Sequence, residues 1–146
     1  MRVGAGMLAM AAAAMLLGGC CSAEYALDPA PEGTTVAEGY RAVAVGTATN
    51  SGYYLFNLWP IVSGHSGRPN AHDYRFFRNN ITPARNAEML QEGMNKVYRA
   101  EKLEQVESRV QCWGYFSLWL VWRRTISTTA IGVRQNRIKK APDAAQ

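Results

Sequence analysis

The strongest constraint on the fold is one amphipathic helix placed between two pairs of strand-like segments. Thr82 and Pro83 begin it, because threonine caps a first turn well and proline is favoured at the first helical position. Apolar residues then recur at steps of three and four: Ala87, Leu90, Met94, Val97 and Tyr98. The pattern predicts a helix that ends near Lys102, with a single apolar face that needs a sheet to cover. Gly93 within it indicates close packing against that sheet.

Alternation with a period of two predicts the strands on either side of this helix. The segments are residues 40–49, 53–59, 106–112 and 125–133. Asn50, Ser51 and Gly52 supply turn chemistry between the first two, and Pro60 closes the second. The first segment has only alanine and glycine on one face, which indicates a close-packed neighbour. The sequence therefore predicts an α+β domain over residues 39–135, with a small antiparallel sheet of about four strands packed with one helix.

The chain begins with a segment typical of a secretory signal. Arg2 supplies a positive charge, and residues 7–17 form an unbroken apolar run. A membrane-spanning helix needs about 20 apolar residues, so the run favours a cleaved signal over a span. The alternative is an alanine-rich helix buried in the protein.

Leu17-Gly18-Gly19-Cys20 resembles the bacterial lipobox, whose cysteine is diacylated and becomes the mature N-terminus. This resemblance implies a lipoprotein signal peptide over residues 1–19 and lipidation at Cys20. Cys21, rather than aspartate, follows the lipidated position. By resemblance to the enterobacterial sorting rule, this implies a lipid-anchored protein of the cell envelope, at the outer membrane and facing the periplasm.

Two polar segments flank the predicted domain. Residues 20–38 contain prolines, a glycine, small residues and acids, which predicts a flexible tether, and residues 136–146 are predicted to be a disordered basic tail. Residues 20–40 carry a net charge of −4, whereas residues 41–146 carry +8. A basic body suits an anionic lipid surface or nucleic acid, and an exported chain rarely meets nucleic acid. The expected partners are the bilayer, through acylated Cys20, and an envelope protein.

The body of the chain has a looser resemblance. Residues 50–56 (NSGYYLF) run into Leu58-Trp59-Pro60, and a helix and two strands follow. This resembles small bacterial lipoproteins with a β-α-β-β unit, the TRL-like family among them, over residues 40–134. The resemblance implies fold and location, and no catalytic residue.

Residues with catalytic or metal-binding chemistry are few. His65, His72 and Asp73 share one polar loop and form a candidate metal site, although their spacing matches no regular ligand pattern. The serines lack a nucleophile elbow, and no glycine-rich phosphate loop is present. Cys112 lies in a strand-like run, which favours a buried free thiol over a bridge with Cys21. The sequence predicts a protein that is not an enzyme and has no cofactor.

Two aromatic runs, residues 53–59 and 113–122, contain all four tryptophans. One interpretation is that both build the core. The other is a hairpin tip that contacts a membrane or a partner, because tryptophan and tyrosine prefer the headgroup layer and arginine meets lipid phosphate. The residues of this tip are Trp113, Tyr115, Phe116, Trp119, Trp122, Arg123 and Arg124.

These observations predict a non-enzymatic envelope lipoprotein with a structural or partner-binding role at the membrane surface. The alternative is a periplasmic lipoprotein that binds a ligand or metal through the histidine loop or an aromatic pocket.

Overall fold

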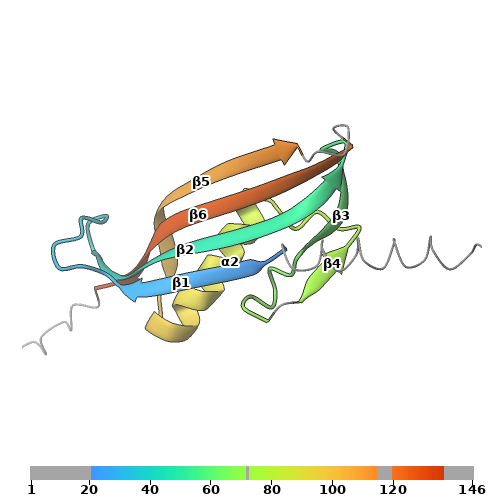
Figure 1. Ribbon diagram of the computed structural model, residues 1–146. Helices are drawn as coiled ribbons and strands as arrows, with labels where there is room; N and C mark the ends of the chain where they lie inside the picture. The colour runs from blue at the N-terminus through green and yellow to red at the C-terminus, as the bar shows by residue number, and fades with distance from the viewer. Residues whose placement is uncertain (1–20, 72, 115–119, 137–146) are drawn as a thin grey trace, which may run out of the picture.

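In the part of the chain that the structure describes, the fold is an antiparallel sheet with one helix on one face (Figure 1). The computed structural model describes residues 21–71, 73–114 and 120–136, so the predicted signal peptide with Cys20, and residues 137–146 of the predicted tail, lie outside it. The elements are β1 (Ala23–Pro29), β2 (Tyr40–Leu55), β3 (Trp59–Gly64), β4 (Tyr74–Phe76), α2 (Pro83–Tyr98), β5 (Lys102–Gly114) and β6 (Val121–Gln135). The predicted α+β class is confirmed, but the sheet has six strands instead of about four.

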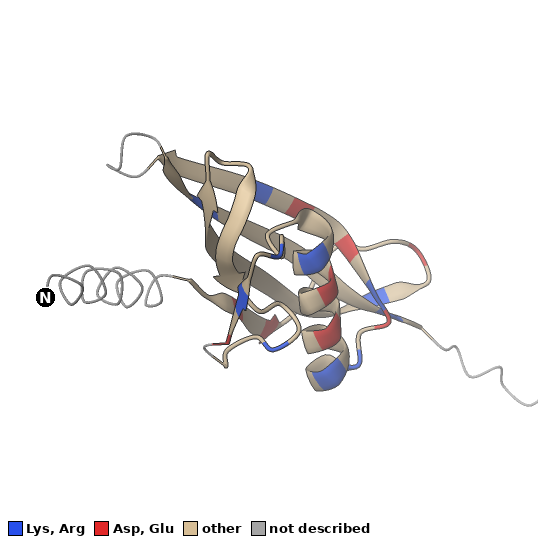
Figure 2. Ribbon diagram, turned by 90° about the vertical axis from the view of Figure 1, so that its right-hand side faces the viewer, with Lys and Arg blue, Asp and Glu red and all other residues tan. Residues whose placement is uncertain are grey.

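The strand order is β4-β3-β2-β6-β5, and β1 also pairs with β2. β1 and β3 lie on the same side of β2, one after the other: β1 pairs with residues 44–50 and β3 with residues 52–55. Helix α2 packs on one face of the sheet, chiefly over β1, β2 and β6 (Figure 2). The opposite face, which we call the open face, is turned toward the viewer in Figure 1, and no described helix covers it.

Strand β1 corrects the prediction of a flexible tether over residues 20–38. Ala23, Tyr25 and Leu27 alternate with polar or small residues and pack on the core beneath α2, while Pro29 stands only at the strand's end. The prolines and acids of residues 20–38 favoured a flexible tether in the sequence analysis, although residues 23–27 also alternate with a period of two. The fold therefore begins almost immediately after residue 20.

Strand β2 is continuous, so the turn predicted at residues 50–52 is wrong. Asn50 and Ser51 are buried within the strand, where the Asn50 side chain donates to the carbonyl oxygens of Gly64 and Asn80 (3.4 and 3.2 Å). The hairpin turn instead falls at Phe56 and Asn57, both with positive φ (50° and 59°). Two consecutive residues of positive φ suit the twist of a tight hairpin.

Helix α2 begins as predicted, since the Thr82 hydroxyl accepts from the Arg85 N–H and Pro83 opens the first turn. It ends earlier than predicted. Arg99 adopts the left-handed conformation, its N–H caps the last turn, and Lys102 already begins β5. The predicted apolar stripe is shifted, because Val97 is exposed and Asn86 is buried. The Asn86 amide donates to backbone oxygens of both β2 and β6, at Ala48 and Ile126 (3.1 Å each).

The helix lies close to the sheet because the strands beneath it carry very small side chains. Ala44, Gly46 and Ala48 face α2 from β2, which confirms the close neighbour that the alanine and glycine face predicted. Gly93 is equally crowded, since a Cβ there would lie 3.1 Å from the Tyr25 ring. Met94 fills the space over Gly46.

Strand β5 corrects the prediction that Cys112 is buried. β5 is the edge strand beyond β6, and α2 covers little of it, so Cys112 is exposed as a free thiol. Cys21 is buried, and its thiol donates to the Val62 carbonyl oxygen (4.0 Å). The predicted hairpin between residues 113 and 122 joins β5 and β6, with its residues 115–119 outside the described chain.

We expect Gly46→Val to destabilise the domain by about 1–3 kcal/mol, because overpacking a filled site forces side chains and backbone to shift. A Cβ at position 46 would already lie 2.6 Å from the Leu27 Cδ2 and 2.9 Å from the Ala26 oxygen. Urea unfolding measures the change. The control is Ala26→Val on the exposed face of β1, and equal effects of the two substitutions would contradict the packing described.

Candidate membrane-facing surface

The described chain begins on the open face, already fixed in the sheet. Cys21 is buried against Tyr53 and Val62. Ser22 makes two hydrogen bonds with Ser51: its N–H donates to the Ser51 hydroxyl (3.0 Å), and its carbonyl accepts from the Ser51 N–H (2.8 Å). A Cβ at Gly64 would collide with the peptide between Ser22 and Ala23, so the chain passes directly over the glycine of β3. Residue 20 is thus one peptide away from the core.

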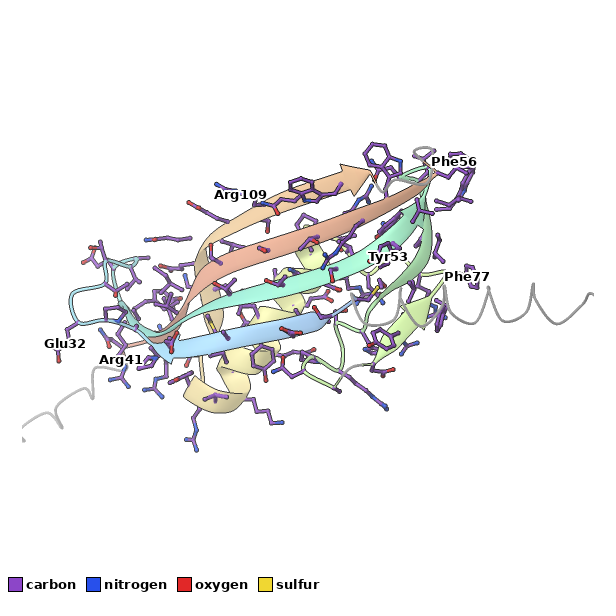
Figure 3. All side chains as sticks on the ribbon, viewed as in Figure 1. Glu32, Arg41, Tyr53, Phe56, Phe77 and Arg109 are labelled. Atoms are coloured by element: carbon purple, nitrogen blue, oxygen red, sulfur yellow. The ribbon has the colours of Figure 1, made fainter. Side chains whose placement is uncertain are left out.

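Exposed apolar side chains gather at the same end of the sheet. Figure 3 shows Phe56 and Phe77 at this end, opposite Glu32. They belong to three segments: the β2–β3 turn, the end of β4, and the β5–β6 hairpin. We call the set the aromatic patch, and its members are Phe56, Leu58, Trp59, Phe76, Phe77, Trp113 and Leu120.

Strand register places part of the patch on the open face. Trp59 pairs with Leu55, Phe76 pairs with Val62, and these positions share the face of Tyr53. Trp113 pairs with Arg123 on the same face. Trp59 and Trp113 are 60% and 66% exposed, so the core accounts for little of their surface. A patch of this kind marks an interaction site more often than an ordinary surface.

The three segments that carry the patch hold positive charge only. Residues 53–62, 74–81 and 113–124 contain no aspartate or glutamate and four arginines: Arg75, Arg78, Arg123 and Arg124. Arg75 and Arg78 are exposed. The nearest acid along the chain, Asp73, forms an ion pair with Arg68 (3.8 Å). The segments of the aromatic patch therefore carry only basic charges, and Arg75 and Arg78 are the two exposed ones.

Arg124 holds the β2–β3 turn in place. Its guanidinium donates to the backbone and side-chain oxygens of Asn57 (2.9 and 3.0 Å) and lies 4.4 Å from the centre of the Tyr54 ring. The Tyr54 hydroxyl donates to Asn79 Oδ1 (2.6 Å), which ties β2 to the segment before α2. Burial raises the pKa of Tyr54, partly offset by the neighbouring Arg124 charge. This network makes the turn a rigid platform for Phe56 and Trp59.

The predicted hairpin residues are divided between different places. Trp113 is exposed in the patch, whereas Trp122 is half-buried on the helix side against Tyr54 and Ile81. Arg124 binds Asn57, and Arg123 is half-buried beside Trp113. Tyr115, Phe116 and Trp119 lie outside the described residues.

Phe56, Phe76 and Phe77 were not among the predicted site residues. The sequence did contain a signal for Phe76 and Phe77, because they are adjacent in a polar, basic segment. Two neighbouring rings in such a segment point in different directions, so at least one is expected to be exposed. Among the described residues of the two aromatic runs, the prediction of a core position is confirmed for Tyr53 and Tyr54, which are buried.

The histidine loop brings two of its three candidate ligands together through the backbone. The His65 N–H donates to the Asp73 carbonyl (3.0 Å), while His72 lies outside the described residues. Within the described chain, no three histidine, cysteine or acidic side chains form a group suited to a metal. A hollow of about 340 Å³ with a mixed polar and apolar lining lies beside this loop, lined by Glu24, Tyr25, Asn70 and Asp73 among others. It is the space that the ligand-binding alternative would use.

Comparisons with known proteins do not assign this site. No protein-family model matches the chain, and searches of curated proteins and of solved structures find no match. The resemblance to lipoproteins stays a prediction from the motifs. None of the described helical segments has the length and apolar character that crossing a bilayer requires.

The pH dependence of stability tests the role of Tyr54 in holding the β2–β3 turn. The pKa of Tyr54 is raised in the folded state, so the folded protein keeps the phenol proton that the unfolded chain releases, and the contribution of Tyr54 to stability is lost as the pH rises above about 10. We expect Tyr54→Phe to lower the free energy of unfolding near neutral pH, and the gap from wild type to narrow at alkaline pH. Urea unfolding at several pH values measures it. A gap that stays constant above pH 10 would contradict this account.

Proposed function

We propose that the chain is a non-enzymatic bacterial envelope lipoprotein, anchored by acyl chains on Cys20 and resting on the bilayer through its aromatic patch. One observation supports this most: the chain joins the fold at Cys21, on the open face at the end that carries the patch. The membrane anchor and the exposed aromatic side chains would then act on the same side of the molecule.

The short connection limits how far the body can leave the membrane. An extended residue spans at most about 3.6 Å, and Cys21 is already buried. A flexible tether of nineteen residues, as the sequence predicted over 20–38, would let the body tumble well away from the surface. With the anchor one peptide from the core, the open face stays next to the headgroups.

The chemistry of the patch suits that position. Tryptophan prefers the interface between headgroups and acyl chains, and each arginine near an anionic surface contributes about 1 kcal/mol. Acyl chains supply most of the affinity, since each buried methylene is worth about 0.8 kcal/mol. The aromatic patch and Arg75 and Arg78 would mainly set the orientation of the body.

This orientation points α2 away from the bilayer. Figure 2 shows acidic and basic residues along the helix, on the side of the molecule opposite the open face. In the outer membrane, where we place the protein, that side would face the periplasm. The proposed role is accordingly to hold or support an envelope partner at the membrane surface.

Mass spectrometry of the native protein tests the anchor. We expect residues 1–19 to be absent and the mass of fatty acyl groups to be added at Cys20. Cys20→Ser should abolish both changes, whereas Cys21→Ser, one residue later and buried, should keep them. Intact protein that retains Met1 without added lipid mass would refute the envelope assignment.

Tryptophan reporters test the orientation once the acyl mass is confirmed. We expect the extra emission of Phe77→Trp, in acylated protein on vesicles, to be quenched by lipids brominated in the upper acyl chain. The matched control is Glu32→Trp at the opposite end of the molecule, whose extra emission should not be quenched. Equal quenching, or none, at the two positions would exclude docking through the patch and leave the anchor unaffected.

A further inference from the structure

Strand β5 is an edge strand, and no strand among the described residues pairs with its outer side. It pairs with β6 on the other side, and residues 105–114 are exposed. Val106 and Val110 are 47% and 49% exposed, which is unusual for valines inside a strand. Proteins usually protect such edges with prolines, bulges or covering loops, because the unpaired backbone groups pair readily with another strand.

The protection covers only the start of β5. The residues that connect β1 to β2 reach over it, where the Ala37 N–H donates to Glu104 Oε2 (3.0 Å) and the Gln105 amide donates to the Thr35 oxygen (3.1 Å). A bulge between Glu104 and Glu107 also breaks the register there. From Glu107 to Gly114 the strand pairs regularly with β6 and contains no proline.

The free part of the strand has a sequence that complements itself. Residues 106–110 read Val-Glu-Ser-Arg-Val. In an antiparallel pair centred on Ser108, Val106 of one copy lies opposite Val110 of the other, and Glu107 lies opposite Arg109. Each of these pairs occurs twice. Opposite charges and β-branched pairs are the cross-strand neighbours that stabilise a sheet.

The two kinds of pair also fall on consistent faces. The Ser108 hydroxyl contacts Thr128 Oγ1 (2.8 Å), a buried residue on the side of α2, so both valines face that side. Glu107 and Arg109 pair with Thr129 and Ser127 and therefore face the open side. Valine meets valine on one face of the joined sheet, and acid meets base on the other.

Neighbouring registers lose this match. A pair centred on Glu107 puts the two glutamates opposite each other, and a pair centred on Arg109 does the same with the arginines. Both also place a valine opposite Ser108. Because a one-residue slip moves side chains to new partners, the Ser108 register is favoured over its neighbours.

We propose that a second copy of this chain pairs with β5, in an antiparallel two-fold dimer centred on Ser108. In an antiparallel pair of strands, the central residue can occupy a hydrogen-bonded or a non-hydrogen-bonded position, so Ser108 can lie at the centre. A two-fold interface uses the same surface on both copies. The axis runs perpendicular to the sheet, so both open faces point the same way. The pairing does not depend on acylation at Cys20, but it is compatible with two anchors in one bilayer.

Disulfide crosslinking of the full chain tests the register. In a Cys112→Ser background, we expect Ser108→Cys to form a dimer on mild oxidation, because residues directly opposite have Cβ atoms about 5 Å apart. The matched control is Gln111→Cys, equally exposed on β5, where the two copies would lie about 20 Å apart and should not crosslink. Equal crosslinking at 108 and 111, or none at either, would overturn the proposal.

Charge reversal tests the partner independently of cysteine chemistry. Glu107→Arg and Arg109→Glu each create two like-charge pairs, so we expect each to weaken dimerisation about tenfold in sedimentation experiments. The double variant, Glu107→Arg with Arg109→Glu, restores opposite charges and should restore the dimer. Because recovery requires a folded chain, it separates a lost interface from a misfolded variant. A double variant as weak as the singles, or a wild type that stays monomeric, would refute the dimer.

Discussion

The long ladder between β2 and β6, pressed close to α2, is the constraint on which the rest of the molecule depends. β2 pairs with β6 from Tyr40 to Leu55, so a single pair of strands runs the whole length of the sheet. The helix covers only the half of this ladder where Ala44, Gly46 and Ala48 allow close approach. Asn86 joins the layers by donating to the backbone of both strands. The other half extends beyond the helix and carries the exposed side chains.

The position of α2 explains why two different surfaces are exposed. Trp59 and Phe76 lie on the open face, which no described helix covers. β5 lies beyond the edge of the helix, so its valines are exposed on the helix side. A single short helix cannot bury both faces of a six-stranded sheet. In the proposed function the bilayer contacts one uncovered surface, and in the proposed dimer a second copy contacts the other.

The two proposals share a geometry. A two-fold axis perpendicular to the sheet keeps both open faces, and both copies of Cys21, on one side. A dimer of this kind would present two aromatic patches, one at each end, to the same membrane. The helices would lie on the far side, free to contact a periplasmic partner. Tyr54 and Arg124 would keep each β2–β3 turn rigid, so that docking requires little rearrangement.

Local patterns in the sequence determined the fold class, the start of α2 and most of the strands, because period, capping and small-residue faces are properties of neighbouring residues. Thr82 capped the helix as its type requires, and the alanine and glycine of β2 marked the close approach of α2. The lipobox resemblance at Cys20 is likewise a matter of four adjacent residues.

Other features depended on partners distant in the chain. Residues 23–29 form a strand because they pair with β2. Asn50 and Ser51 lie within β2 because hydrogen bonds with Gly64, Asn80 and Ser22 satisfy their polar groups. Tertiary packing decided which aromatic and cysteine side chains are buried. Tyr54 is buried on the helix side, Tyr53 and Cys21 are buried together on the open face, and Cys112 is exposed on an edge strand that α2 barely covers. No alternation pattern encodes these outcomes, because they depend on which distant segments cover each part of the sheet.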